Sequence, residues 1–169
     1  MRTHLLTTTA VLALLAASTV STRAQTNWTG LISSDWFTAP NWTGGVPTAV
    51  TSATIDTLNR PTVVDANPRA TALSLVVGRV GVGSFTIQNG GVLTTLGGGF
   101  VGAFVGRGDV TVTGPGSAWT NITGLGGAGI QVGGGVGVGT LTVDNGASVN
   151  GGFFGELITV GGAAFSPEH

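Results

Sequence analysis

The sequence contains no cysteine and no lysine, and only 8% of its residues are charged. Without cysteine the chain has no disulfide framework, no thiolate metal ligand and no thiol nucleophile. Its 6 basic side chains, all arginine, stand against 7 acidic ones, so the formal net charge is −1. That balance excludes the strongly basic surface expected of a protein that binds nucleic acid or an anionic membrane.

Histidine is equally scarce, since its only positions are His4 and His169, close to the two ends of the chain. The acidic residues are scattered singly: Asp35, Asp56, Asp65, Asp109, Asp144, Glu156 and Glu168. A glycosidase needs two facing carboxylates, and lone charges in proteins are mostly solvated. The sequence therefore predicts no catalytic residue, no cofactor site and no metal ligand, and a protein that is not an enzyme.

Glycine, by contrast, is abundant, with 31 residues, and hydrophobic residues make up 41% of the chain. This hydrophobic fraction argues against a disordered chain, and the absence of a strict G-x-y period excludes collagen. Glycine-rich segments also separate short runs in which apolar and polar residues alternate. The composition indicates a compact β-rich chain with many turns.

Two segments resemble each other closely: residues 77–90 read VGRVGVGSFTIQNG and residues 132–146 read VGGGVGVGTLTVDNG. A second kind of unit, GRGDVTVTGPGSAWTN, occupies residues 106–121 between them. The Val-Gly pairs that end at glycines 78, 102, 133 and 161 are 24, 31 and 28 residues apart. We interpret the two kinds of unit as half-repeats of one long repeat, whose differences in length fall in loops. Such self-similarity is typical of stacked architectures.

One strand of four to six residues cannot bury its apolar face alone, whereas stacked coils share one apolar core. The sequence therefore predicts an all-β fold, a right-handed parallel β-helix (β-solenoid). Short strands are expected at residues 53–56, 62–64 and 72–77, with turns at 57–60 and 65–69. The alternative is an antiparallel β-sandwich, because the Asn-Gly dipeptides at 89–90 and 145–146 are also hairpin signals.

The chain divides into three parts. Residues 1–24 read as a secretory signal peptide, with Arg2 and His4 before the apolar run AVLALLAA at 10–17 and small residues at Thr22 and Ala24. That run is too short to span a bilayer. Residues 25–72 are interpreted as an N-terminal cap and first coil, and residues 73–169 as solenoid repeats that are truncated at the C-terminus.

Three tryptophans, Trp28, Trp36 and Trp42, lie close together in the segment expected to form the cap. An open solenoid end exposes apolar core and unpaired strand edge, so terminal repeats are usually atypical. We expect the three rings to cover the first coil. A carbohydrate-stacking surface is the alternative, because exposed tryptophan rings offer flat apolar faces.

The half-repeats, together with DWFTAPNWTGGVPT at residues 35–48, resemble the repeats of bacterial autotransporter (type V secretion) passengers and PEP-CTERM-associated exported proteins. The resemblance covers most of the chain from about Trp28 to Gly162. It implies an exported cell-surface or extracellular β-helix that is structural or adhesive, with host-surface or matrix glycans or proteins as partners. It implies no common catalytic residues, and the net charge of −1 predicts no nucleic-acid partner. The C-terminal barrel or sorting tail of these proteins is missing, so we expect a fragment that contacts the membrane only through such a part.

Three other functions match single features of the sequence, and the sequence disfavours the last two. A carbohydrate-active β-helix enzyme, a polysaccharide lyase or hydrolase, would need acids that converge on one face, for example Asp109 with Asp144. The tripeptide at 107–109, Arg-Gly-Asp, would bind integrins only on an exposed loop, and a polar turn that enters a strand is the simpler interpretation. Ice binding by outward threonines at 111, 113 and 142 needs a regular flat array, which the uneven repeat spacing disfavours.

Overall fold

The structure, a computed structural model, describes residues 24–66, 68–122, 128–152 and 158–160. It is all-β, with one short 3₁₀ helix, η1 (Ala39–Asn41). The strands are β1 (Ala24–Asn27), β2 (Thr51–Ile55), β3 (Thr62–Val64), β4 (Ala70–Ala72), β5 (Leu75–Val77), β6 (Val82–Ile87), β7 (Val92–Thr95), β8 (Gly99–Val101), β9 (Arg107–Thr113), β10 (Ala118–Asn121), β11 (Ile130–Val132), β12 (Val138–Asp144), β13 (Ser148–Asn150) and β14 (Thr159–Val160).

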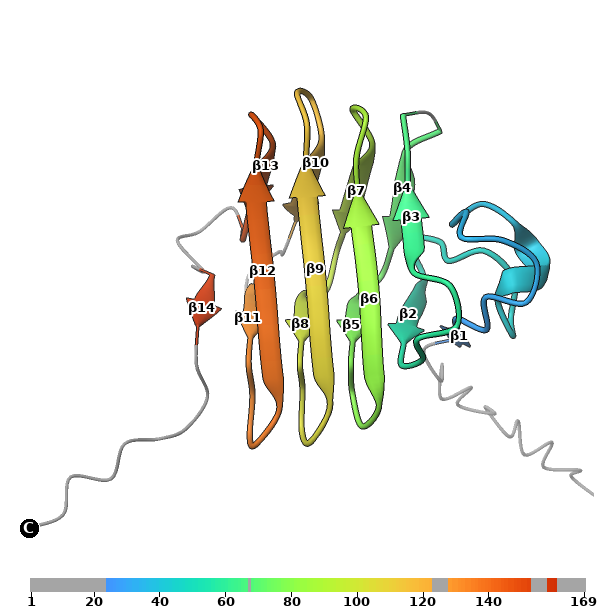
Figure 1. Cartoon of the computed structure of the whole chain (residues 1–169), viewed down its shortest axis with the longest axis horizontal. Coiled ribbons are helices and arrows are strands. Elements are labelled where there is room, and N and C mark those ends of the chain that lie inside the picture. The colour runs from blue at the N-terminus through green and yellow to red at the C-terminus, as the bar shows by residue number, and fades with distance from the viewer. Residues whose placement is uncertain (1–23, 67, 123–127, 153–157, 161–169) are drawn as a thin grey trace, which may run out of the picture.

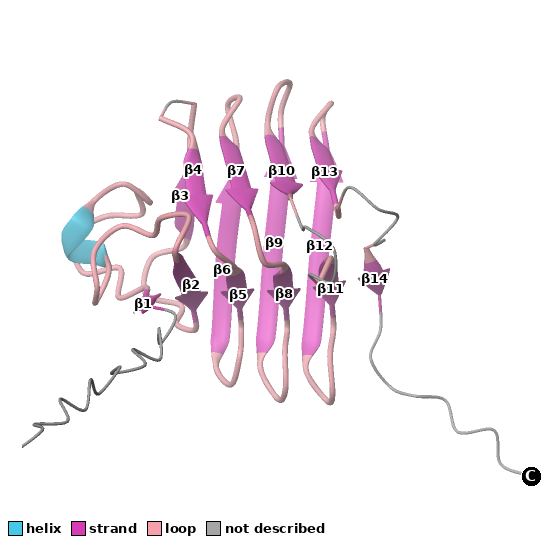
Figure 2. Ribbon diagram, turned by 180° about the vertical axis from the view of Figure 1, so that it is seen from behind, coloured by secondary structure: helices cyan, strands magenta, loops and turns pink. Residues whose placement is uncertain are grey.

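These strands form three sheets that run along the length of the molecule (Figure 1). The first sheet has the order β1-β2-β5-β8-β11-β14, the second β3-β6-β9-β12 and the third β4-β7-β10-β13. The chain visits the three sheets in turn, so that β5, β6 and β7 form one coil and β8, β9 and β10 form the next. In Figures 1 and 2 the chain runs up β6, β9 and β12 on one side and returns on the other, advancing as a right-handed coil.

All the ladders between named strands are parallel, which confirms the predicted parallel β-solenoid and makes the antiparallel sandwich wrong. The Asn-Gly dipeptides form corners between the second and third sheets and do not close hairpins. At the first of them both residues have positive φ, 54° at Asn89 and 80° at Gly90. Glycine and asparagine tolerate this left-handed backbone, so the dipeptide marks a tight turn in either architecture.

The structural repeat is one coil, which corresponds to a single half-repeat. Phe85 pairs with Val110, and Val110 pairs with Leu141, so the two kinds of half-repeat lie directly on each other. The irregular spacing arises between strands, as predicted. Three residues separate β7 from β8, whereas eight separate β10 from β11.

One predicted strand is wrong. Residues 72–77 are not continuous, because β4 ends at Ala72 in the third sheet and β5 begins at Leu75 in the first sheet. Leu73 and Ser74 form the corner between them. No glycine or proline marks this corner, which is why the alternation of side chains suggested one strand.

The core is a column of inward side chains that alternate with outward ones along each strand. Val110 is 1% exposed, and Leu141 is partly buried against the same core. Trp119 fits inside because Gly99 faces it, where a Cβ atom would lie 2.2 Å from the indole. Its indole N–H donates to Thr95 Oγ1 at 3.1 Å, so the polar atom of the ring is satisfied within the core.

The tryptophan cap is confirmed. Trp28 and Trp36 each pack edge to face on Trp42, with ring centroids 5.0 and 4.8 Å apart, and Trp36 lies 5.5 Å from the core residue Phe85. The three rings are at most 4% exposed. They therefore seal the end of the core column, and they offer no face on which a sugar could stack, so the alternative interpretation of these rings is wrong.

The predicted signal peptide lies outside the described residues, apart from Ala24, which begins β1. The whole of β1 pairs with β2, beginning with Ala24 on Thr51, so the first ladder includes both the last residue of the predicted signal peptide and Gln25, the residue expected to follow cleavage. Within the part of the chain that the structure describes, no helix is long and apolar enough to cross a membrane.

Candidate functional site

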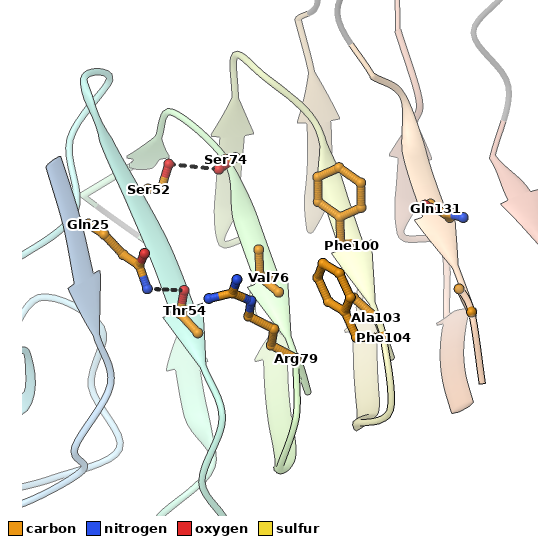
Figure 3. A pocket seen from close by; sticks show the side chains of 12 residues that line it. Gln25, Ser52, Thr54, Ser74, Val76, Arg79, Phe100, Ala103, Phe104 and Gln131 are labelled. Carbon is orange, nitrogen blue, oxygen red and sulfur yellow. Dashed lines mark hydrogen bonds between the residues drawn. The ribbon is translucent and has the colours of Figure 1, made fainter. Parts of the chain in front are cut away.

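A groove of about 570 Å³ lies along the outer face of the first sheet (Figure 3). Its floor is one row of outward side chains at equivalent positions of successive strands: Thr54, Val76, Phe100 and Gln131. Neighbouring strands in a sheet lie about 4.8 Å apart, so this row is about 14 Å long. The fold therefore presents four different side chains in a straight line.

One wall of the groove consists of the loops that leave the first sheet, and it carries Arg79, Ala103 and Phe104. The Arg79 guanidinium carbon lies 5.4 Å from the centre of the Phe104 ring, within the range of a cation–π contact. Phe104 is nevertheless 61% exposed. Together with Phe100 on the floor, it gives the groove two accessible aromatic side chains.

The N-terminal part of the groove is polar. The Gln25 side-chain amide donates to Thr54 Oγ1 at 3.2 Å, and Ser74 Oγ donates to Ser52 Oγ at 2.8 Å (Figure 3). Gln25 is exposed and the two serines are partly buried, so these three remain accessible to water and to a ligand, whereas Thr54 is only 6% exposed. Apolar and aromatic side chains combined with a few convergent polar groups are the usual composition of a ligand site.

Arg79 supplies the charge of the groove. Among the described residues the one ion pair is Arg107–Asp109, at 3.3 Å, so no carboxylate lies within 4.0 Å of the Arg79 guanidinium. The carboxylate of Asp56 instead accepts hydrogen bonds from the backbone N–H groups of Arg79 and Gly81, at 2.7 and 2.9 Å. The guanidinium can therefore pair with an external anion.

The acids considered for an enzyme do not converge. Asp109 pairs with Thr140, and Asp144 pairs with Thr113, on the outer face of the second sheet. The two aspartates are thus four residues apart along adjacent strands, which corresponds to about 13 Å. Carboxylates of inverting glycosidases are about 6.5–9.5 Å apart and those of retaining ones are closer, so this pair does not fit that chemistry.

The other described acids have local structural roles. Asp35 accepts hydrogen bonds from Phe37 N–H and Thr38 Oγ1, and Asp65 accepts one from Asn89 Nδ2. His4, Glu156, Glu168 and His169 lie outside the described residues. Within the described ranges, no three His, Cys, Asp or Glu side chains are grouped so as to hold a metal ion.

The Arg-Gly-Asp tripeptide begins β9, as the simpler interpretation of it predicted. Arg107 and Asp109 are paired with each other on the outer face of the sheet, and Gly108 between them is buried. A Cβ atom at Gly108 would lie 2.1 Å from the carbonyl oxygen of Val77, so this glycine is required by stacking. The tripeptide is not on an exposed loop.

The outward threonines are more regular than the repeat spacing suggested. Thr86 pairs with Thr111, and Thr111 pairs with Thr142, because the differences in coil length fall between strands. The spacing argument against ice binding is therefore wrong. The same face, however, carries the charged Arg107–Asp109 pair and Asp144 beside the threonines, so it is not a uniform hydroxyl array.

These features define the class of the protein, a capped, three-sided β-solenoid with a groove along one outer face. No protein-family model, curated protein or solved structure matches the chain. The groove was not predicted from the sequence. Its floor could have been found, since Val76, Phe100 and Gln131 are the residues before the valine in three successive Val-Gly pairs.

Proposed function

We propose that the chain is an exported structural or adhesive protein of the bacterial surface, similar to an autotransporter passenger or a PEP-CTERM-associated protein. The observation that carries this proposal is the groove on a capped stack of in-register coils. Parallel ladders fix each coil on the next, so the stack acts as a rigid rod. A rod that displays one line of ligand-binding side chains suits attachment to an extended surface.

Export is tested by expressing the full chain in a Gram-negative host and sequencing the N-terminus of the protein that leaves the cytoplasm. We expect the exported form to begin at Gln25, after removal of residues 1–24. Replacing Ala24 with arginine should block this cleavage, because the −1 position requires a small residue. Retention of the intact unprocessed chain in the cytoplasm would contradict the proposed export.

Adhesion is tested with beads that carry the purified chain, applied to immobilised polysaccharides and matrix proteins. We expect retention on at least one such surface above that of beads carrying bovine serum albumin. The soluble polysaccharide is incubated with the protein in parallel, and its reducing ends are measured. Cleavage without retention would favour the carbohydrate-active enzyme instead. If the protein shows neither retention nor cleavage, both functions are contradicted.

A further inference from the structure

Phe104 has a backbone conformation that a glycine adopts at the equivalent position of the next coil. The loops at 102–108 and 133–139 are stacked and have equal length, with Gly108 paired to Gly139. The same hydrogen bond closes both turns, from Gly106 N–H to Ala103 O and from Gly137 N–H to Gly134 O, each 3.0 Å long. Phe104 in the first loop therefore corresponds to Gly135 in the second.

The shared conformation is left-handed, with φ of 54° at Phe104 and 65° at Gly135. Glycine adopts this region freely, whereas a bulky L-residue is strained there. The phenylalanine gains little in return within the fold, because it is 61% exposed. Strained residues concentrate at functional sites, and an exposed aromatic ring is a typical binding residue.

We propose that the groove binds an acidic polysaccharide, a chain of sugar units that carry carboxylates, and that Phe104 and Phe100 stack on its sugar rings. This inference rests on the proposed adhesive function and names the ligand of that surface. Sugar rings have apolar C–H faces that fit aromatic rings, and hydroxyl groups that fit the amides and hydroxyls of Gln25, Gln131 and Ser74. The row of about 14 Å accommodates an oligosaccharide segment.

Arg79 accounts for the acidic character of the ligand. Its guanidinium lies beside Phe104 and has no carboxylate partner among the described residues. Arginine presents a planar fork of N–H donors that binds a carboxylate through two parallel hydrogen bonds. A sugar carboxylate next to a stacked ring would complete both contacts at once.

An extended peptide fits the groove less well. The floor strands β5 and β8 are each hydrogen-bonded to neighbours on both sides, so they have no free edge for an added strand. Recognition at this surface must use side chains alone. A glycan needs only such side-chain contacts.

The experiment measures binding of the full chain to polygalacturonate and to its methyl-esterified form, which has the same backbone without the charge. Isothermal titration calorimetry is suitable. We expect the acidic form to bind at least about tenfold more tightly, because a hydrogen-bonded charge pair contributes at this level. Arg79→Gln should remove that preference, while Arg107→Gln, with the same change in charge on the second sheet, should keep it.

The aromatic contacts are tested with Phe104→Gly and Phe104→Ala. Both should weaken binding of the acidic and the esterified polymer alike, by about tenfold or more, since they remove the ring and leave Arg79 in place. Phe104→Gly should also unfold at an equal or higher denaturant concentration than wild type, because glycine relieves the strained φ. That combination separates a binding role from a structural one.

Equal affinity of the wild type for both polymers, or equal losses in Arg79→Gln and Arg107→Gln, would overturn the proposed ligand. The proposed ligand would also be overturned by a peptide or matrix protein whose binding depends on Phe104 and is not displaced by either polymer. If beads carrying the Arg79→Gln and Phe104→Gly variants still adhere as the wild type does, the groove is not the adhesive site, although the adhesive function itself is supported. If wild-type beads adhere to no surface, the adhesive function itself fails.

Discussion

The cap and the coils reach the same degree of burial by different means. The coils use parallel backbone ladders, and their inward side chains stack in register. The cap has an irregular backbone that three tryptophans and one buried asparagine, Asn41, hold together. The difference shows that a repeat supplies its own neighbours, whereas an end must replace the missing neighbour with large side chains and specific hydrogen bonds.

The largest expected effect comes from removing the centre of the cap. Trp36→Ala deletes a fully buried ring that contacts both Trp42 and Phe85, so we expect a loss of about 3–5 kcal/mol in the free energy of unfolding. Guanidinium denaturation followed by far-UV circular dichroism measures it. Trp119→Ala in a middle coil is the matched control, with a similar loss. A loss below about 1 kcal/mol for Trp36→Ala alone would show that the coils need no cap.

Two buried asparagines allow the comparison to be made with one residue type. In the cap, Asn41 Oδ1 accepts from the N–H groups of Ile32 and Ser33, at 2.9 and 3.1 Å. In the coils, Asn121 Oδ1 accepts from Thr95 Oγ1 and Gly98 N–H, at 3.0 and 3.1 Å. Each amide thus replaces backbone partners that the local geometry lacks.

Asn41→Ala and Asn121→Ala should each cost about 1–3 kcal/mol, because buried donors and acceptors lose their partners. The effects should differ in extent. Hydrogen exchange should speed up only in the cap for Asn41→Ala, but across three consecutive coils for Asn121→Ala, since Asn121 bonds to Thr95 in the coil before it and to Gly151 in the coil after it. Equal and global acceleration in both variants would contradict the view that the cap is a separate local unit.

The junction between cap and first coil is the least satisfied part of the described structure. Its two buried side-chain polar atoms without a hydrogen-bond partner are Trp36 Nε1 and Thr62 Oγ1. Thr62→Val replaces the hydroxyl with a methyl group of similar shape, so we expect the free energy of unfolding to rise by up to about 1 kcal/mol. Thermal denaturation measures it, with Thr26→Val as control, because Thr26 Oγ1 donates to Gly45 O at 3.0 Å. A clear loss in Thr62→Val would indicate a partner at that hydroxyl.

The fold was predictable because its determinants are local and repeated. Alternation of Val, Thr and Phe, and glycine at equivalent corners, recur in each coil. The length of the unit was less clear, because units that stack directly, such as those at Phe85 and Val110, differ in sequence. The core requires only an inward apolar residue from each of the two kinds of unit, and several residue types meet that requirement.

The groove depends on the identities of the outward residues, which the alternation of apolar and polar side chains does not specify. Outward residues such as Val76, Phe100 and Gln131 differ in chemical type and do not determine the fold. Their place before each Val-Gly pair could have aligned them, but the pairing of the strands shows that they form one row. The strain at Phe104 was likewise accessible only by comparison with Gly135, which requires the loops to be aligned first.

The smallest expected effect concerns the outer surface of the coils. Arg107→Gln breaks the ion pair with Asp109, whose side chains are 60% and 41% exposed. Exposed pairs contribute only about 0.2–1 kcal/mol to stability and are screened by salt. The substitution should therefore shift the denaturation midpoint only slightly, and the shift should be smaller still in 0.5 M NaCl. Gly108→Ala between them is the contrast, because its added Cβ would collide with the Val77 carbonyl and should destabilise strongly. If the two variants were equally mild, stacking of the coil backbones would not be the interaction that holds β9 in place.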